Sequence, residues 1–88
     1  MNDYFYVIYQ TYTSIHDDSY ATNILGVTTD LEEAKEKFRI YRAQEHTYAT
    51  SNGYRIYTDD DCCFDAGREG EYITENTRVK IEKIRRQE

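Results

Sequence analysis

The stretch DLEEAKEKFRIYRAQEH, residues 30–46, decides the fold class because it predicts one amphipathic helix. Asp30 is a favoured N-cap residue, and Glu33 three residues later completes a capping-box pattern. Acidic side chains follow in the first turns, and Arg39 and Arg42 come later, as the helix macrodipole favours. Apolar side chains at helical spacing form the stripe Leu31, Ala34, Phe38 and Tyr41. We expect this stripe to pack on a sheet and the helix to end within residues 47–53.

Strand-like stretches flank this helix on both sides. They are rich in aromatic and β-branched residues and cover residues 4–13, 22–29, 54–58 and 77–84. The order predicts an α+β fold of type ββαββ, an antiparallel four-stranded sheet with one helix packed on one face. At 88 residues the chain is expected to form a single domain, residues 1–88.

The first strand is apolar on both faces, which favours a position inside the sheet. Phe5, Val7 and Tyr9 alternate on one face. If the helix covers that face, an open sheet face is left that carries Tyr4, Tyr6 and Tyr12. Such tyrosines could contact a partner, since Tyr offers broad contact area at low entropic cost.

The stretch DDDCCFD, residues 59–65, concentrates four carboxylates and two thiols in an expected acidic loop. A calcium loop starting at Asp59 lacks the required glycine and glutamate, and one starting at Asp60 places Cys62 and Phe64 where oxygen ligands belong. Adjacent Cys62 and Cys63 lack the spacing of zinc ligands. The nearby carboxylates are expected to raise the thiol pKa and to oppose a cysteine nucleophile. No combination of nucleophile, base and orienting group stands out, and the glycines form no phosphate-binding loop. We therefore expect no metal, no cofactor and no enzymatic activity.

Charge narrows the class of partner. The net charge is −6; residues 1–77 carry 15 acidic and 6 basic side chains, whereas residues 78–88 carry 2 and 5. This balance disfavours nucleic acid as a partner and favours a protein with a basic surface, with a homodimer as a further option. No apolar run reaches membrane-spanning length, and the first residues lack a secretory pattern. We expect a cytoplasmic protein with reduced cysteines and no membrane contact.

The predicted contact surface joins acidic and tyrosine side chains, because the chain holds ten tyrosines and its small core cannot bury them all. Carboxylates would attract a basic partner and tyrosines would anchor it. The predicted contact residues are Asp59, Asp60, Asp61, Asp65, Glu69 and Glu71, flanked by Tyr57 and Tyr72.

The segment ILGVTTDLEEAKEKF, residues 24–38, resembles a pattern in small phage and mobile-element proteins: a strand ending in Gly-Val, a Thr-Asp cap and a helix opening with Glu-Glu-Ala. Size, acidity and tyrosine content are similar to those of small inhibitors of bacterial defence systems, including anti-CRISPR proteins. This resemblance implies a compact, non-catalytic protein that blocks a host enzyme, and it transfers no functional residue.

The leading hypothesis is therefore a small acidic inhibitor that occupies a basic surface on a host nucleic-acid-processing or defence enzyme. Two alternatives stay open. One is a small-molecule or nucleotide-binding module in which Arg55 or Arg78 meets an anion. The other is a homo-oligomeric accessory protein whose Tyr-rich edge strands pair across a two-fold axis.

Overall fold

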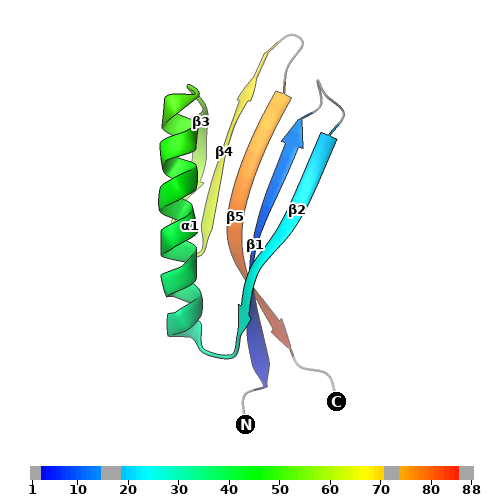
Figure 1. Cartoon of the computed structure of the whole chain (residues 1–88), viewed down its shortest axis with the longest axis vertical. Coiled ribbons are helices and arrows are strands. Elements are labelled where there is room, and N and C mark those ends of the chain that lie inside the picture. The colour runs from blue at the N-terminus through cyan, green and yellow to red at the C-terminus, as the bar shows by residue number, and fades with distance from the viewer. Residues whose placement is uncertain (1–2, 15–18, 71–73, 86–88) are drawn as a thin grey trace.

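The computed structural model describes residues 3–14, 19–70 and 74–85 and shows one helix on a five-stranded antiparallel sheet (Figure 1). The sheet order is β2-β1-β5-β4-β3. The elements are β1 Tyr4–Ser14, β2 Ser19–Thr28, α1 Leu31–Ser51, β3 Arg55–Asp59, β4 Cys63–Glu69 and β5 Thr74–Arg85. The α+β class is confirmed, whereas the predicted count of four strands is wrong.

The additional strand is β4, which falls inside the expected acidic loop. Its sequence CFDAGRE looks unlike a strand because Asp65, Ala66 and Gly67 have low strand propensity. Tertiary pairing overrides that propensity, since β4 pairs with β3 on one side and with β5 on the other. Phe64 and Ala66 are fully buried, which confirms that one face of β4 belongs to the core.

The helix begins where predicted and ends within the predicted range, residues 47–53. The Asp30 carboxylate accepts a hydrogen bond from the Glu32 N–H at 2.9 Å. Glu33 does not close a capping box; it accepts from the Thr28 hydroxyl, which itself accepts from the Asp30 N–H. The helix continues to Ser51, and Gly53 at φ 70° allows the chain to leave it.

The helix lies on the opposite face of β1 from the one expected. Ile8 is packed in the core with Phe38, and Gln10 bonds to the helix, so even-numbered residues of β1 face α1. The predicted open-face residues Tyr4, Tyr6 and Tyr12 are therefore on the helix side, and Phe5, Val7 and Tyr9 are on the uncovered side. Both faces of β1 are apolar, so alternation within this strand alone could not select the side.

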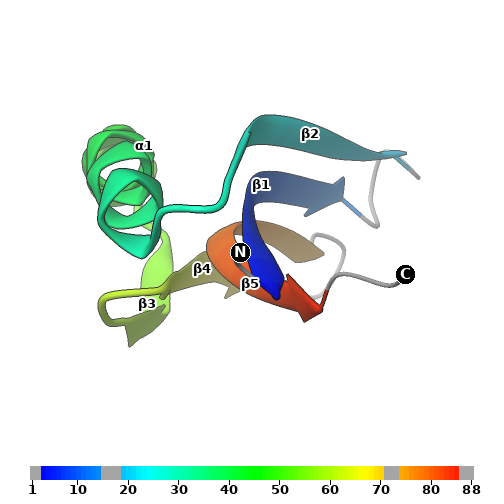
Figure 2. The ribbon, with the colours of Figure 1, turned by 90° about the horizontal axis from the view of Figure 1, so that it is seen from below.

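The sheet curls around α1, which lies on its concave side (Figure 2). The core between them consists of Ile8, Ala34, Phe38, Ala49, Tyr54, Phe64, Ala66, Val79 and Ile81. The molecule is elongated, 50 × 24 × 16 Å, because the long strands extend beyond the helix. β2 and β3 form the two rims of the sheet.

No helix within residues 3–14, 19–70 and 74–85 is both long enough and apolar enough to cross a membrane.

Candidate functional site

The acidic stretch forms the turn between β3 and β4, and Asp60 holds that turn together. One Asp60 carboxylate oxygen accepts hydrogen bonds from the N–H groups of Cys62 at 2.9 Å and Cys63 at 2.8 Å. The Asp60 N–H donates to the Cys63 carbonyl at 3.0 Å. The two N–H donors lower the pKa of Asp60 below its usual value. The Asp60 carboxylate is thus engaged in hydrogen bonds within its own turn.

Two further carboxylates of the predicted surface are engaged in ion pairs. Arg42 Nε lies 2.5 Å from the Asp59 carboxylate, which joins α1 to β3 and raises the Arg42 pKa. Asp65 lies on the uncovered side of the sheet, where it accepts from Arg78 at 3.2 Å and from Asn76 at 2.6 Å. Asp59 and Asp65 therefore point to different faces and do not form one patch.

The other predicted contact residues are dispersed. Asp61 is exposed at the turn, Glu69 is exposed at the end of β4, and Tyr57 is exposed at an irregularity of β3. Glu71 and Tyr72 lie outside the described residues. Among the predicted contact residues that the structure describes, only the three turn residues Asp59, Asp60 and Asp61 lie together.

An open cleft of about 530 Å³ separates this turn from the first half of α1. Its lining is Glu32, Lys35, Phe38, Arg39, Arg42, Asp59, Asp60 and Asp61. Only Phe38 is apolar, whereas small-molecule sites are mostly lined by apolar side chains. Within the described residues, no group of His, Cys, Asp or Glu side chains is arranged to hold a metal ion. The cleft is therefore a charged surface depression, and its size alone does not favour the small-molecule-binding alternative.

The two thiols of the turn are expected to react slowly with iodoacetamide, because alkylation requires thiolate. Partial burial raises the pKa of Cys62 and Cys63, and the hydrogen bond to Asp60 raises that of Cys62 further. The Asp60→Asn variant keeps an oxygen for the turn N–H groups and removes the charge, so Cys62 should be alkylated faster at mildly alkaline pH. Mass spectrometry of the alkylated peptides measures the rates, with Asp61→Asn as control. Equal acceleration in both variants would contradict a specific effect of Asp60.

A second cluster, on the helix side of the sheet, centres on Glu45 of α1. One carboxylate oxygen accepts from the Gln10 amide of β1, and the other accepts from the Thr77 hydroxyl of β5 at 2.9 Å. Both donors are neutral, and none of the four ion pairs found among the described residues includes Glu45. Each carboxylate oxygen can accept more than one hydrogen bond. Glu45 is therefore an oriented, half-buried anion without a cationic partner in the described part of the chain.

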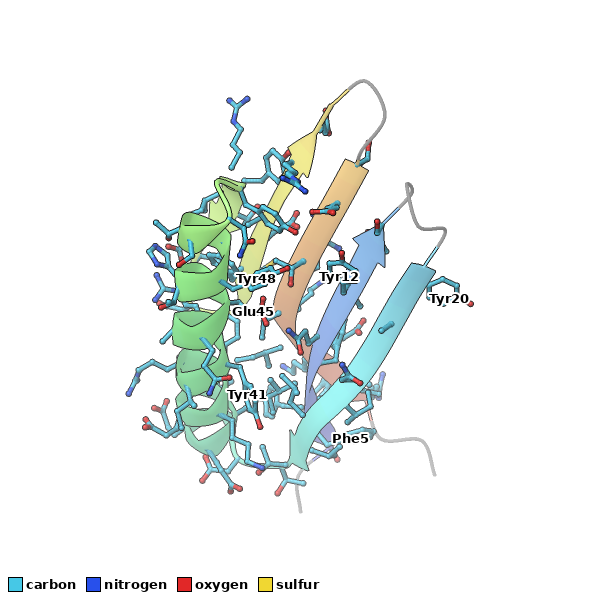
Figure 3. All side chains as sticks on the ribbon, turned by 45° about the horizontal axis from the view of Figure 1, so that its top comes forward. Phe5, Tyr12, Tyr20, Tyr41, Glu45 and Tyr48 are labelled. Carbon is cyan, nitrogen blue, oxygen red and sulfur yellow. The ribbon has the colours of Figure 1, made fainter. Side chains whose placement is uncertain are left out.

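Three tyrosines border Glu45. Tyr41 and Tyr48 lie one helical turn before and after it, and all three side chains project from the same side of α1 (Figure 3). Tyr12 is paired with Thr77 across β1 and β5, and it shares the face of Gln10, so it lies beside both donors of Glu45. Tyr12 and Tyr41 are half-buried, and Tyr48 is 45% exposed. Together, Tyr12, Tyr41, Glu45 and Tyr48 form what we call the tyrosine–carboxylate face.

Next to this face a polar network fixes the end of the helix. The Tyr54 hydroxyl donates to Glu75 at 2.6 Å, and Arg68 donates to the same carboxylate at 3.0 Å. Burial, followed by this bond, raises the pKa of Tyr54. Tyr48 packs edge-on against Tyr54, with ring centroids 5.6 Å apart. Arg68 neutralises Glu75 in this network, whereas Glu45 has no arginine partner among the described residues.

Comparisons with protein-family models, with curated proteins and with solved structures gave no match for this chain.

Proposed function

We propose that this chain is a small, non-catalytic protein that binds a basic surface of a protein partner through the tyrosine–carboxylate face. The observation that supports the proposal is Glu45, a carboxylate oriented by two neutral donors and bordered by three tyrosines. Hydrogen bonds between a guanidinium and a carboxylate are stronger than neutral ones, and tyrosine rings attract cations. An arginine of the partner is the side chain whose chemistry fits this face best.

The acidic turn contributes to this function through its field more than through direct contacts. Asp59 and Asp60 are bound within the protein, yet the chain as a whole keeps a net charge of −6. A net negative charge accelerates encounter with a basic partner, and this effect weakens as salt screens the charges. We therefore place the anchoring contacts at the tyrosine–carboxylate face and the long-range attraction in the overall charge.

The partner class that we propose is a host nucleic-acid-processing or defence enzyme, acting in the cytoplasm. Enzymes that handle nucleic acid carry basic grooves, because phosphate recognition depends on Arg and Lys. Occupation of such a groove by an acidic protein would block its substrate. This role is the one implied by the resemblance to small phage and mobile-element inhibitors.

The proposal is tested with a fluorescent arginine-rich peptide and the same peptide with every arginine replaced by citrulline, which has nearly the same shape and no charge. We expect fluorescence polarisation to show binding of the arginine peptide only. We also expect the affinity to fall as salt is raised, since exposed charges are screened. Equal affinity for both peptides, or no binding of either, would show that the chain does not recognise basic side chains.

A further inference from the structure

The strand β2, Ser19–Thr28, forms a long rim of the sheet that is paired on one side only. Its neighbour is β1, and no described element lies beyond its other side (Figure 2). Alternate backbone N–H and C=O groups of a rim strand point away from the sheet and can pair with another chain. A bulge at Leu25 interrupts the pairing with β1, so residues 19–24 form the regular part of this rim.

β2 lacks the features that usually protect rim strands. Its sequence SYATNILGVT contains no charged residue and no proline, although 32% of the whole chain is charged. The opposite rim, β3, has only five residues, carries Arg55 and Asp59 and is irregular in its pairing with β4. Short, charged or bulged rims resist edge-to-edge association. One rim is therefore protected and the other is open to pairing.

Exposed apolar side chains accompany this open rim. Tyr20 is 81% exposed and Ile24 is 63% exposed, and both lie on the sheet face that α1 leaves uncovered. Partner residues across an antiparallel ladder share a face, and aromatic side chains pair favourably with β-branched ones. A strand added beside β2 could therefore cover Tyr20 and Ile24 if it offered the complementary side chains at the right spacing.

We propose that a second copy of this chain supplies that strand, by antiparallel pairing of the two β2 strands about a two-fold axis at Thr22. This register sets Tyr20 of each copy opposite Ile24 of the other. Any rim strand is self-complementary in the antiparallel sense, which gives a closed dimer. Two copies of net charge −6 repel each other in general, and β2 is a long surface strand without charge through which they can approach. The two sheets then form one continuous sheet.

Charged side chains introduced at Thr22 test this dimer, because the axis sets the two Thr22 side chains opposite each other. Sedimentation velocity over a range of concentrations should show a dimer for the wild type. Thr22→Lys and Thr22→Glu should each associate about fivefold more weakly, since like charges directly opposite each other across a ladder are destabilising. An equimolar mixture of the two variants should restore the dimer. Thr47→Lys, an exposed threonine of α1, is the matched control and should behave as the wild type.

A monomeric wild type at every concentration, or a dimer that Thr22→Lys leaves unchanged, overturns the proposal. A mixture that fails to restore the dimer overturns the axis at Thr22, provided circular dichroism shows both variants folded. If either variant is unfolded, hydrogen exchange of the wild type decides. Amides of residues 20–24 should then exchange more slowly as concentration rises, and concentration-independent exchange overturns the proposal. These measurements involve none of the residues of the tyrosine–carboxylate face, so their outcome is independent of peptide binding.

Discussion

Alanine in place of Gly67 is expected to destabilise the protein by about 1–3 kcal/mol, because its side chain would overlap the backbone of the neighbouring strand. Gly67 lies within β4 and is paired with Asn76 of β5. A Cβ atom built on Gly67 would lie 2.3 Å from the Glu75 carbonyl oxygen and 3.2 Å from the Asn76 Cα. Backbone atoms of a paired strand cannot rotate away as a side chain can, so β4 and β5 must shift apart locally.

Thermal and urea denaturation of the Gly67→Ala variant measure this effect. For a domain of this size each kcal/mol lowers the melting temperature by roughly 4–8 °C. Gly26→Ala is the matched control, since the atoms nearest to its added Cβ belong to the end of the Lys37 side chain, which can move. We expect Gly26→Ala to remain close to the wild type. Equal stability of the two variants would show that the approach of β4 to β5 at Gly67 is not required for the fold.

The helix start could be predicted from sequence because it depends on local chemistry. The Asp30 carboxylate accepts from the N–H of Glu32, only two residues later, and Ala34 and Phe38 are buried at the positions that helical spacing requires. The helix end could be predicted only as a range, residues 47–53, since Thr47 and Thr50 have low helix propensity. Both hydroxyls bond to the carbonyl four residues earlier, and Ala49 is buried in the core, so tertiary packing extends the helix.

Strand β4 could not be predicted, because its stability comes from residues far away in the sequence. Asp65 in a strand becomes acceptable only when Arg78 and Asn76 stand beside it on β5. Residues distant in sequence also determine which side of β1 faces the helix. Ile8 is paired with Ile81, and burial of both sets the face of the sheet on which α1 packs.

Density of charge in the sequence points to the acidic turn, but it does not show which carboxylates already accept hydrogen bonds within the protein. Asp60 is adjacent to two acids, yet its carboxylate is bound by the turn that it forms. Glu45 stands alone in sequence and was missed. A usable signal existed, since Glu45 continues the apolar stripe of Phe38 and Tyr41 at helical spacing, so a carboxylate occupies a position that should face the sheet.

Replacing Glu45 by glutamine is expected to weaken binding of the arginine-rich peptide about tenfold to a hundredfold. A hydrogen bond to a charged group contributes about 1.5–3 kcal/mol, and about 1.4 kcal/mol corresponds to a tenfold change in affinity. Glutamine has the shape of glutamate, and an amide can still exchange hydrogen bonds with Gln10 and Thr77, both of which can donate and accept. The variant therefore removes the charge and preserves the packing between α1 and the sheet.

Glu36→Gln provides the matched control on the same helix. Glu36 is paired with Arg39 on the exposed side of α1, so its replacement changes the net charge by the same amount away from the tyrosine–carboxylate face. Fluorescence polarisation should give nearly wild-type affinity for Glu36→Gln and a large loss for Glu45→Gln, while melting temperatures show that both variants are folded. An equal, small loss in the two variants would mean that the peptide responds only to total charge, and Glu45 would then have no role as an anchor. A loss confined to Glu45→Gln, which persists when salt is raised, would instead locate the arginine at the oriented carboxylate, because salt screens a partly buried pair much less than an exposed one.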